Sequence, residues 1–204
     1  MRNQSLLPVL GIFFFGALWG LSETFLGEAL YTSGLPLPSL YLTLIGFAVL
    51  GLSRAFLPRP GTATAIALLA LLYKGLATNF YCHLAAIGLA GLGFDLCFSL
   101  LAPRLRLLAP FLACLTSGTA FGLMMTFLTN NGFWNSDKLL GHIGVSALTG
   151  LACALAVPLA LKGGEKLRAG GVQAGDRALL PGSVSAATLL LWALSLGLGA
   201  GLLG

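Results

Sequence analysis

The sequence predicts an all-α polytopic membrane protein with a six-helix core and a seventh transmembrane helix. Apolar residues make up 57% of the chain and charged residues 8%, whereas soluble domains have about 25% charged residues. Seven apolar segments have lengths near the roughly 20 residues that cross a ~30 Å hydrocarbon core. Finally, most basic residues lie in those connections between segments that would share one side of the membrane.

That pattern indicates the orientation of the helices. If the N-terminus is cytoplasmic and every segment crosses, only Lys138 lies in an outer loop, and Lys74 lies within a span. Such a bias follows the positive-inside rule, so we expect a multi-pass protein of the bacterial cytoplasmic (inner) membrane. The residues expected on the cytoplasmic side are Arg2, Arg54, Arg59, Arg104, Arg106, Lys162, Lys166, Arg168 and Arg177.

The first three expected spans are 8–31, 37–57 and 62–79. The first follows Met1–Ser5 directly. It is too long for a signal-peptide core and has no small-residue cleavage site, so we expect it to be retained. Proline pairs precede the second and third spans, as is typical of helix boundaries. The third span is short for a full crossing and carries Lys74 near its outer end.

The remaining spans are expected at 83–101, 107–129, 141–161 and 185–203. The joint before the fourth span could be a re-entrant turn instead of a plain outer loop. An amide-rich outer loop precedes the sixth span, and a Gly-rich basic stretch follows it. We therefore expect three parts: a six-span core over 1–161, a basic cytoplasmic loop over 162–184, and a C-terminal transmembrane helix over 185–204.

Three glycines and one carboxylate share a face of the first span. Gly16, Gly20, Glu23 and Gly27 fall at i, i+4, i+7 and i+11, which places them on one side of a helix. Because small residues let a neighbouring helix approach closely, we expect Glu23 to face protein rather than lipid. Glu23 could be a structural carboxylate, paired with Lys74 or protonated, or it could belong to a binding site.

The sixth span carries a polar stripe of its own. His142, Ser146, Thr149 and Cys153 repeat at helical spacing and share one face. Serine and threonine can hydrogen-bond to their own helix backbone. We therefore interpret this stripe, when it is considered alone, as a surface that packs against a neighbouring helix.

Polar and aromatic side chains gather in the outer half of the expected bundle. Such residues are costly in lipid, and their concentration at one mouth favours an outward-open cavity for a small polar ligand. Two glutamates against one lysine favour a cationic ligand, and the aromatic side chains could stack on a planar ring. Glu28 could equally be a solvated rim residue. The substrate-binding candidates are Glu23, Glu28, Tyr31, Lys74, His83, Asn130, Asn131, Trp134 and His142.

We find no pattern typical of an enzyme, a metal site or a cofactor. The chain lacks a His-Glu-x-x-His helix, a Gly-x-Ser-x-Gly elbow and a Walker A loop, so we expect no catalysis and no cofactor. The net charge of +5 belongs to cytoplasmic loops facing lipid headgroups, and no nucleic-acid partner is expected. Two lone histidines are more often interface residues than metal ligands. No Cys-x-x-Cys spacing occurs among Cys82, Cys97, Cys114 and Cys153.

The chain resembles the substrate-binding S component of energy-coupling factor transporters, which are small bacterial membrane proteins with a six-helix core. The resemblance covers residues 8–161 and rests on size, on the N-inside six-span core and on the run Gly16-Ala17-Leu18-Trp19-Gly20. It implies that Gly16 and Gly20, as a small-xxx-small motif, dock onto a transmembrane coupling subunit. It also implies ATPase partner subunits and an outward-facing pocket for a vitamin or vitamin precursor. The seventh span is a departure from the family.

We therefore expect a component that captures a small polar, cationic or heterocyclic nutrient. Its glutamates would neutralise ligand charge, Tyr31 and Trp134 would stack, and the 130–138 loop would act as a lid. One alternative is a self-contained secondary carrier or proton-coupled permease with Glu23, Lys74 and Asp95 as a relay. Another is a membrane enzyme or assembly factor, for which the sequence supplies no catalytic cluster.

Overall fold

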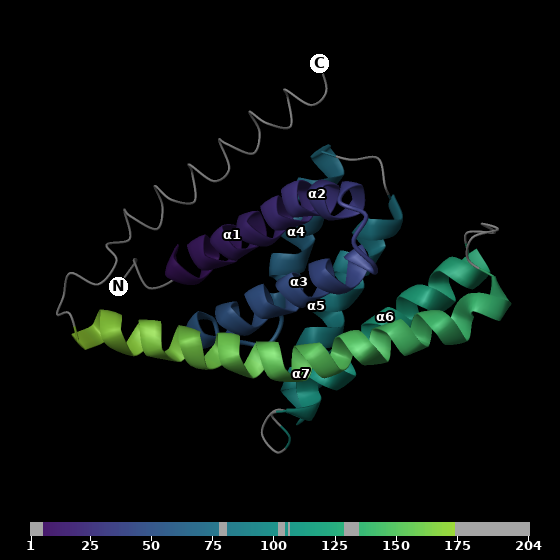
Figure 1. Cartoon of the computed structure of the whole chain (residues 1–204). Helices are drawn as coiled ribbons and strands as arrows, with labels where there is room; N and C mark the ends of the chain where they lie inside the picture. The colour runs from purple at the N-terminus through teal and green to yellow at the C-terminus, as the bar shows by residue number, and fades with distance from the viewer. Residues whose placement is uncertain (1–5, 78–80, 102–104, 106, 129–134, 174–204) are drawn as a thin grey trace.

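The computed structural model describes residues 6–77, 81–101, 105, 107–128 and 135–173, and every regular element within them is a helix (Figure 1). The first rod joins three segments end to end: α1 (Leu6–Leu21), the π-helical turn η1 (Ser22–Leu26) and α2 (Gly27–Thr32). The elements that follow are α3 (Pro38–Phe56), α4 (Thr62–Ala77), α5 (Tyr81–Leu101), α6 (Leu108–Leu128) and α7 (Ser136–Gln173).

The helices confirm the all-α polytopic class, and the chain is a multi-pass membrane protein. Five of the described helices are long and apolar enough to cross a membrane. The remaining helix, α4, has 16 residues. It rises about 24 Å at 1.5 Å per residue, which is less than the ~30 Å thickness of the hydrocarbon core. The seventh span expected from the sequence, 185–203, lies outside the described residues.

Contacts between neighbouring rods close a ring in the order α1, α4, α5, α6, α7, α3. Sequence neighbours α1 and α3 are therefore adjacent, while α4 lies on the other side of α1. The start of α1 faces the end of α3, since a Cβ built on Gly11 would lie 3.1 Å from the Leu57 side chain. In Figure 1 the first part of α7 runs beside α6 and its later part beside α3, in agreement with these contacts.

Glycines make close approach possible at the interfaces of this ring. A Cβ built on Gly20 in α1 would lie 2.7 Å from Cβ of Tyr73 in α4. One built on Gly51 in α3 would lie 3.0 Å from Val157 in α7. Gly91 is in equally tight contact with Ala67 across α5 and α4. Close packing of this kind is the main source of helix association in lipid, where burial of apolar surface gives little driving force.

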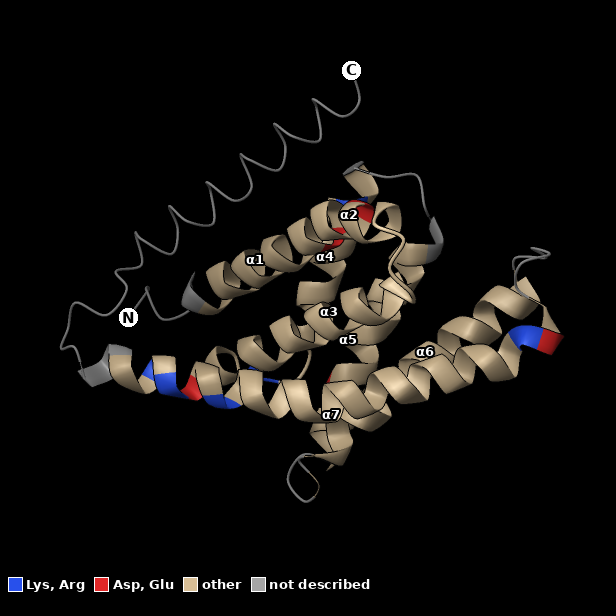
Figure 2. Cartoon of the chain, viewed as in Figure 1, with Lys and Arg blue, Asp and Glu red and all other residues tan. Residues whose placement is uncertain are grey.

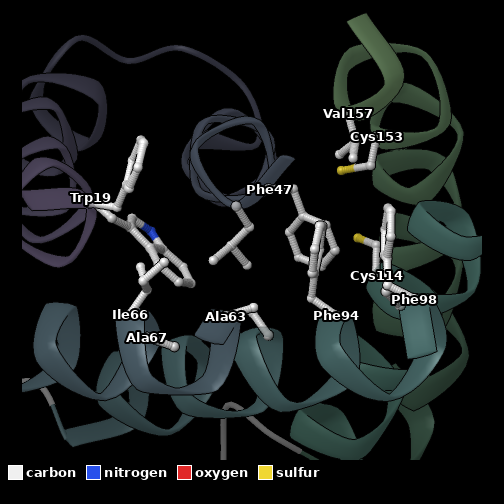
Figure 3. Packing of buried hydrophobic residues seen from close by; sticks show 14 of the residues in the cluster. Trp19, Phe47, Ala63, Ile66, Ala67, Phe94, Phe98, Cys114, Cys153 and Val157 are labelled. Carbon is white, nitrogen blue, oxygen red and sulfur yellow. The ribbon is translucent and has the colours of Figure 1, made fainter. Parts of the chain in front are cut away.

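The buried core lies inside the ring and is built around aromatic side chains (Figure 3). Phe47 of α3 meets Phe94 of α5 edge to face, with ring centroids 5.9 Å apart. Phe94 in turn stacks on Phe98 at 4.1 Å. Trp19 of α1 packs over Gly46 of α3, where any side chain would collide with the indole. This core holds α1, α3, α4 and α5 in a fixed arrangement.

The expected loop at 162–184 is wrong for its first part, because α7 continues as a helix to Gln173. The glycines there serve packing instead of breaking the helix: a Cβ on Gly164 would lie 2.7 Å from Cβ of Ala55 at the end of α3. The Arg168 guanidinium also donates a hydrogen bond to the Ala55 carbonyl at 3.1 Å. These contacts stabilise a helix of 38 residues, about 57 Å long and much longer than the hydrocarbon core.

The charged residues gather toward the ends of the rods, and most helical surface between them is uncharged (Figure 2). Arg54 at the end of α3 donates to the Arg59 carbonyl at 2.7 Å, and Arg168 contacts the same end of α3. We call this the basic end, formed by Arg54, Arg59, Lys162, Lys166 and Arg168. The other basic residues expected there, Arg2, Arg104, Arg106 and Arg177, lie outside the described residues.

Candidate functional site

Glu23 lies in the π-helical turn η1, at the join between α1 and α2. A π turn inserts one extra residue into an α-helix and is frequent at functional sites. The Ser22 hydroxyl donates to the Trp19 carbonyl at 2.7 Å, and the Thr24 hydroxyl donates to the Gly20 carbonyl at 2.9 Å. These bonds satisfy backbone carbonyls where the regular helical pattern is interrupted. Glu23 thus points inward from a widened turn whose carbonyls have local partners.

Glu23 forms a buried ion pair with Lys74 of α4. The Lys74 Nζ atom lies 2.7 Å from Glu23 Oε2, and the two side chains are 4% and 10% exposed. The other carboxylate oxygen, Oε1, accepts a longer hydrogen bond of 3.4 Å from Trp19 Nε1. Glu23 is therefore buried against protein, and of the alternatives left open for it the structure shows the ion pair with Lys74.

Tyr31 and His83 lie beside this pair. The Tyr31 hydroxyl is 3.4 Å from His83 Nε2, and the two rings stack with centroids 5.7 Å apart. His83 also interacts electrostatically with both Lys74 and Glu23, and Tyr31 does so with Glu23. The four residues, from η1, α2, α4 and α5, form what we call the Glu23–Lys74 cluster.

The other expected binding residues are distributed differently. Glu28 is exposed on α2. His142 lies on the face of α7 that meets α6, since a Cβ on Gly122 would lie 3.9 Å from its Cβ, and the start of α7 is well separated from α2 in Figure 1. Asn130, Asn131 and Trp134, with the expected lid loop, lie outside the described residues.

Gly16 and Gly20 pack within the chain. Cβ atoms built on them would lie 2.7 Å from Cβ of Leu69 and of Tyr73, both on α4. The spacing of the two glycines predicts that another helix packs closely on this face, and in the structure that helix is α4 of the same chain. In this arrangement α4 covers the face that the family resemblance assigns to a coupling subunit, and docking of a partner there stays a prediction.

A second group of polar residues, Asp95, Thr64 and Arg54, lies toward the basic end. The sequence pattern alone did not reveal that these residues meet. Asp95 Oδ2 accepts hydrogen bonds of 2.7 Å from both the backbone N–H and the hydroxyl of Thr64, in the first turn of α4. Arg54 Nη1 lies 3.7 Å from Asp95 Oδ1. A carboxylate at a helix N-terminus satisfies free N–H groups and complements the helix dipole. Asp95 thus caps α4 and ties α3, α4 and α5 together.

The position of Asp95 separates it from Glu23 and Lys74, the other two members of the relay considered from the sequence. Ten residues of α4 separate Thr64 from Lys74, a rise of about 15 Å, so Asp95 and the Glu23–Lys74 cluster occupy opposite ends of α4. Asp95 already has a structural role where it lies. The polar stripe of α7 is likewise a packing seam: Ser146 and Thr149 donate to carbonyls of their own helix, and Cys153 is buried in the core.

The described residues contain no group of three or more His, Cys, Asp or Glu side chains that could hold a metal ion. Cys97, Cys114 and Cys153 are free thiols. Chemically, the site offers a buried anion and a buried cation in contact, next to a stacked phenol and imidazole of which Tyr31 is 49% exposed. Comparison with protein families, with curated proteins and with solved structures found no match to this chain.

Proposed function

We propose that this chain is the membrane-embedded capture component of an uptake transporter for a small polar molecule, such as a vitamin or its precursor. The observation that carries the proposal is the buried Glu23–Lys74 ion pair on a π turn. Charged side chains are rare inside membrane segments, and where they occur they commonly mark substrate or ion pathways. Here both charges lie beside an aromatic pair that reaches the surface.

The proposed orientation places the basic end in the cytoplasm of a bacterium, in accordance with the positive-inside rule. The Glu23–Lys74 cluster then lies toward the outer face, and the solute enters there past Tyr31 and His83. The capture role includes a transmembrane coupling subunit and ATPase subunits, because the chain has no nucleotide-binding loop of its own.

A test of the binding role uses the purified chain and a cell extract. The protein is equilibrated with soluble metabolites, washed, and the retained molecules are identified by mass spectrometry. We expect a retained solute with the natural chain and its loss with Glu23→Gln/Lys74→Gln, which removes both charges at nearly constant volume. The control Glu165→Gln/Lys166→Gln removes one acid and one base from an exposed part of α7 at the basic end and should retain the solute. Equal retention by both double variants would contradict the site.

A self-contained secondary carrier is the second candidate, because a buried ion pair can also couple solute movement to protons. It requires no partner. Affinity purification from native membranes in mild detergent distinguishes the two: the capture role predicts a second membrane subunit and an ATPase. Solute flux in liposomes that contain only this chain, without ATP, would favour the carrier.

A further inference from the structure

The charge balance of the Glu23–Lys74 cluster restricts the ligands it can hold. The pair carries one negative and one positive charge, and both side chains are almost fully buried. Glu28, the next acidic residue along the chain, is exposed on α2 and is not part of this buried pair. Removing one member of a buried pair leaves an uncompensated buried charge, which is strongly destabilising.

A ligand with a single charge would create such a defect. A cation that takes Glu23 competes with the Lys74 ammonium for the carboxylate, and an anion that takes Lys74 competes with the Glu23 carboxylate for the ammonium. A ligand with both groups avoids the defect, because its ammonium can pair with Glu23 while its carboxylate pairs with Lys74. The net charge of the site then remains zero throughout.

Building on the proposed function, we infer that the ligand is a small zwitterion of the amino-acid type, which binds by exchanging ion-pair partners with Glu23 and Lys74. The two protein charges come from different elements, η1 and α4, so they can separate without breaking either helix. Tyr31 and His83, which reach the cluster from α2 and α5, supply ring faces and polar atoms for the ligand's third substituent. This replaces the cationic ligand that two glutamates against one lysine had suggested.

The test compares ligands that share one side chain and differ in charge. The full-length chain in detergent micelles is screened by thermal shift against the twenty common amino acids. Each binding amino acid with an uncharged side chain is then compared with its methyl ester, which carries a net positive charge, and its N-acetyl form, which is an anion. We expect the zwitterion to bind about tenfold more tightly than either derivative, or better, which corresponds to ~1.4 kcal/mol or more.

Variants should change the preferred charge in a defined direction. In Lys74→Gln the free carboxylate should favour the methyl ester, and in Glu23→Gln the free ammonium should favour the N-acetyl form. Glu23→Gln/Lys74→Gln should lose binding of all three, and this double variant avoids a lone buried charge if the single variants fail to fold. The matched control Glu165→Gln/Lys166→Gln should keep the preference for the zwitterion.

Preferential binding of an ester or an N-acetyl derivative by the natural chain would overturn the ligand class. Failure of all twenty amino acids to bind would overturn it as well. In either case the metabolite-retention experiment still decides separately whether the chain binds a solute at this cluster. Binding that persists in the Glu23→Gln/Lys74→Gln variant would place the ligand elsewhere and overturn the inference.

Discussion

At the scale of single residues, the Glu23–Lys74 pair dominates the energetics of the site. Its geometry is that of a strong charge-assisted hydrogen bond, with N and O atoms 2.7 Å apart. Such a pair stabilises the fold mainly relative to the state in which one partner is missing, because the remaining charge is then buried alone. The two single variants and the double variant should therefore differ in a characteristic way.

We predict that Lys74→Ala lowers the free energy of unfolding by about 3–5 kcal/mol, the range for breaking a buried pair. The double variant Glu23→Gln/Lys74→Gln should lose less stability than the sum of the losses in Glu23→Gln and Lys74→Gln, because it leaves no lone charge. Denaturant unfolding in detergent micelles measures both effects. A Lys74→Ala variant as stable as the natural chain would contradict the buried pair.

A second residue-scale prediction concerns Gly20. In Gly20→Ala the new methyl group would lie 2.7 Å from Cβ of Tyr73, so α1 and α4 must separate, at a cost of about 1–3 kcal/mol. The control is Gly144→Ala on α7, where no atom lies within 4 Å of an added Cβ, and where alanine favours the helix. Thermal unfolding should show a loss for the first variant only. Equal stability of the two would mean that α4 does not pack on this face.

The residues of the site were partly predictable from the sequence. Helical spacing placed Glu23 on the glycine face of its helix and left pairing with Lys74 as one of several alternatives, and the structure shows that pair. The contact between Tyr31 and His83 could not be derived, because the two lie 52 positions apart and their meeting depends on how three helices pack. Asp95 was visible as an acid within a span, but its capping of α4 requires the orientation of α5 against α4.

At the scale of elements, two features departed from the regular pattern expected from hydropathy. The π turn η1 has no periodicity signal of its own, because one inserted residue shifts the apolar pattern without interrupting it. The extension of α7 was hidden by Gly163 and Gly164, since glycine is a poor helix former. Tight packing of Gly164 on Ala55 outweighs that propensity.

We predict that deleting Phe25, an exposed residue of η1, converts the π turn into regular α-helix. Glu23 should keep its place opposite Lys74, while α2 rotates by about 100° and Tyr31 leaves His83. In a cysteine-free background, Tyr31→Cys/His83→Cys should be joined by a short bifunctional maleimide. The Phe25 deletion should abolish this cross-link while the protein stays folded. Cross-linking that survives the deletion would show that η1 does not orient α2.

At the scale of the whole molecule, the ring of six rods separates two polar groups. The basic end joins the end of α3 to the extension of α7, and the Glu23–Lys74 cluster joins η1, α2, α4 and α5. The all-α class and the positions of six helices were predictable from hydropathy alone, apart from the extension of α7. The order of helices around the ring was not, because small-residue contacts that select it are too common in membrane helices to identify partners.

The proposed orientation predicts opposite accessibility at the two ends of α7. Ser136→Cys and Gly170→Cys, both at exposed positions, should react with a membrane-impermeant thiol reagent from opposite sides of sealed cell-membrane vesicles. Gly170→Cys should react only from the cytoplasmic side. Reaction of both from the same side would contradict a single crossing by α7.

The most direct test of the account is solvent access at Gly27, a buried position one helical turn beyond Glu23, which a reagent reaches only along a path to the cluster. A Cβ there would make only an ordinary contact of 3.7 Å with Leu42, so Gly27→Cys should be tolerated. We predict that an impermeant methanethiosulfonate modifies this cysteine from the outer side only, and that the metabolite extract containing the retained solute slows the reaction. A cysteine that no reagent reaches from either side, or whose modification the extract leaves unchanged, would contradict a solute site at the Glu23–Lys74 cluster.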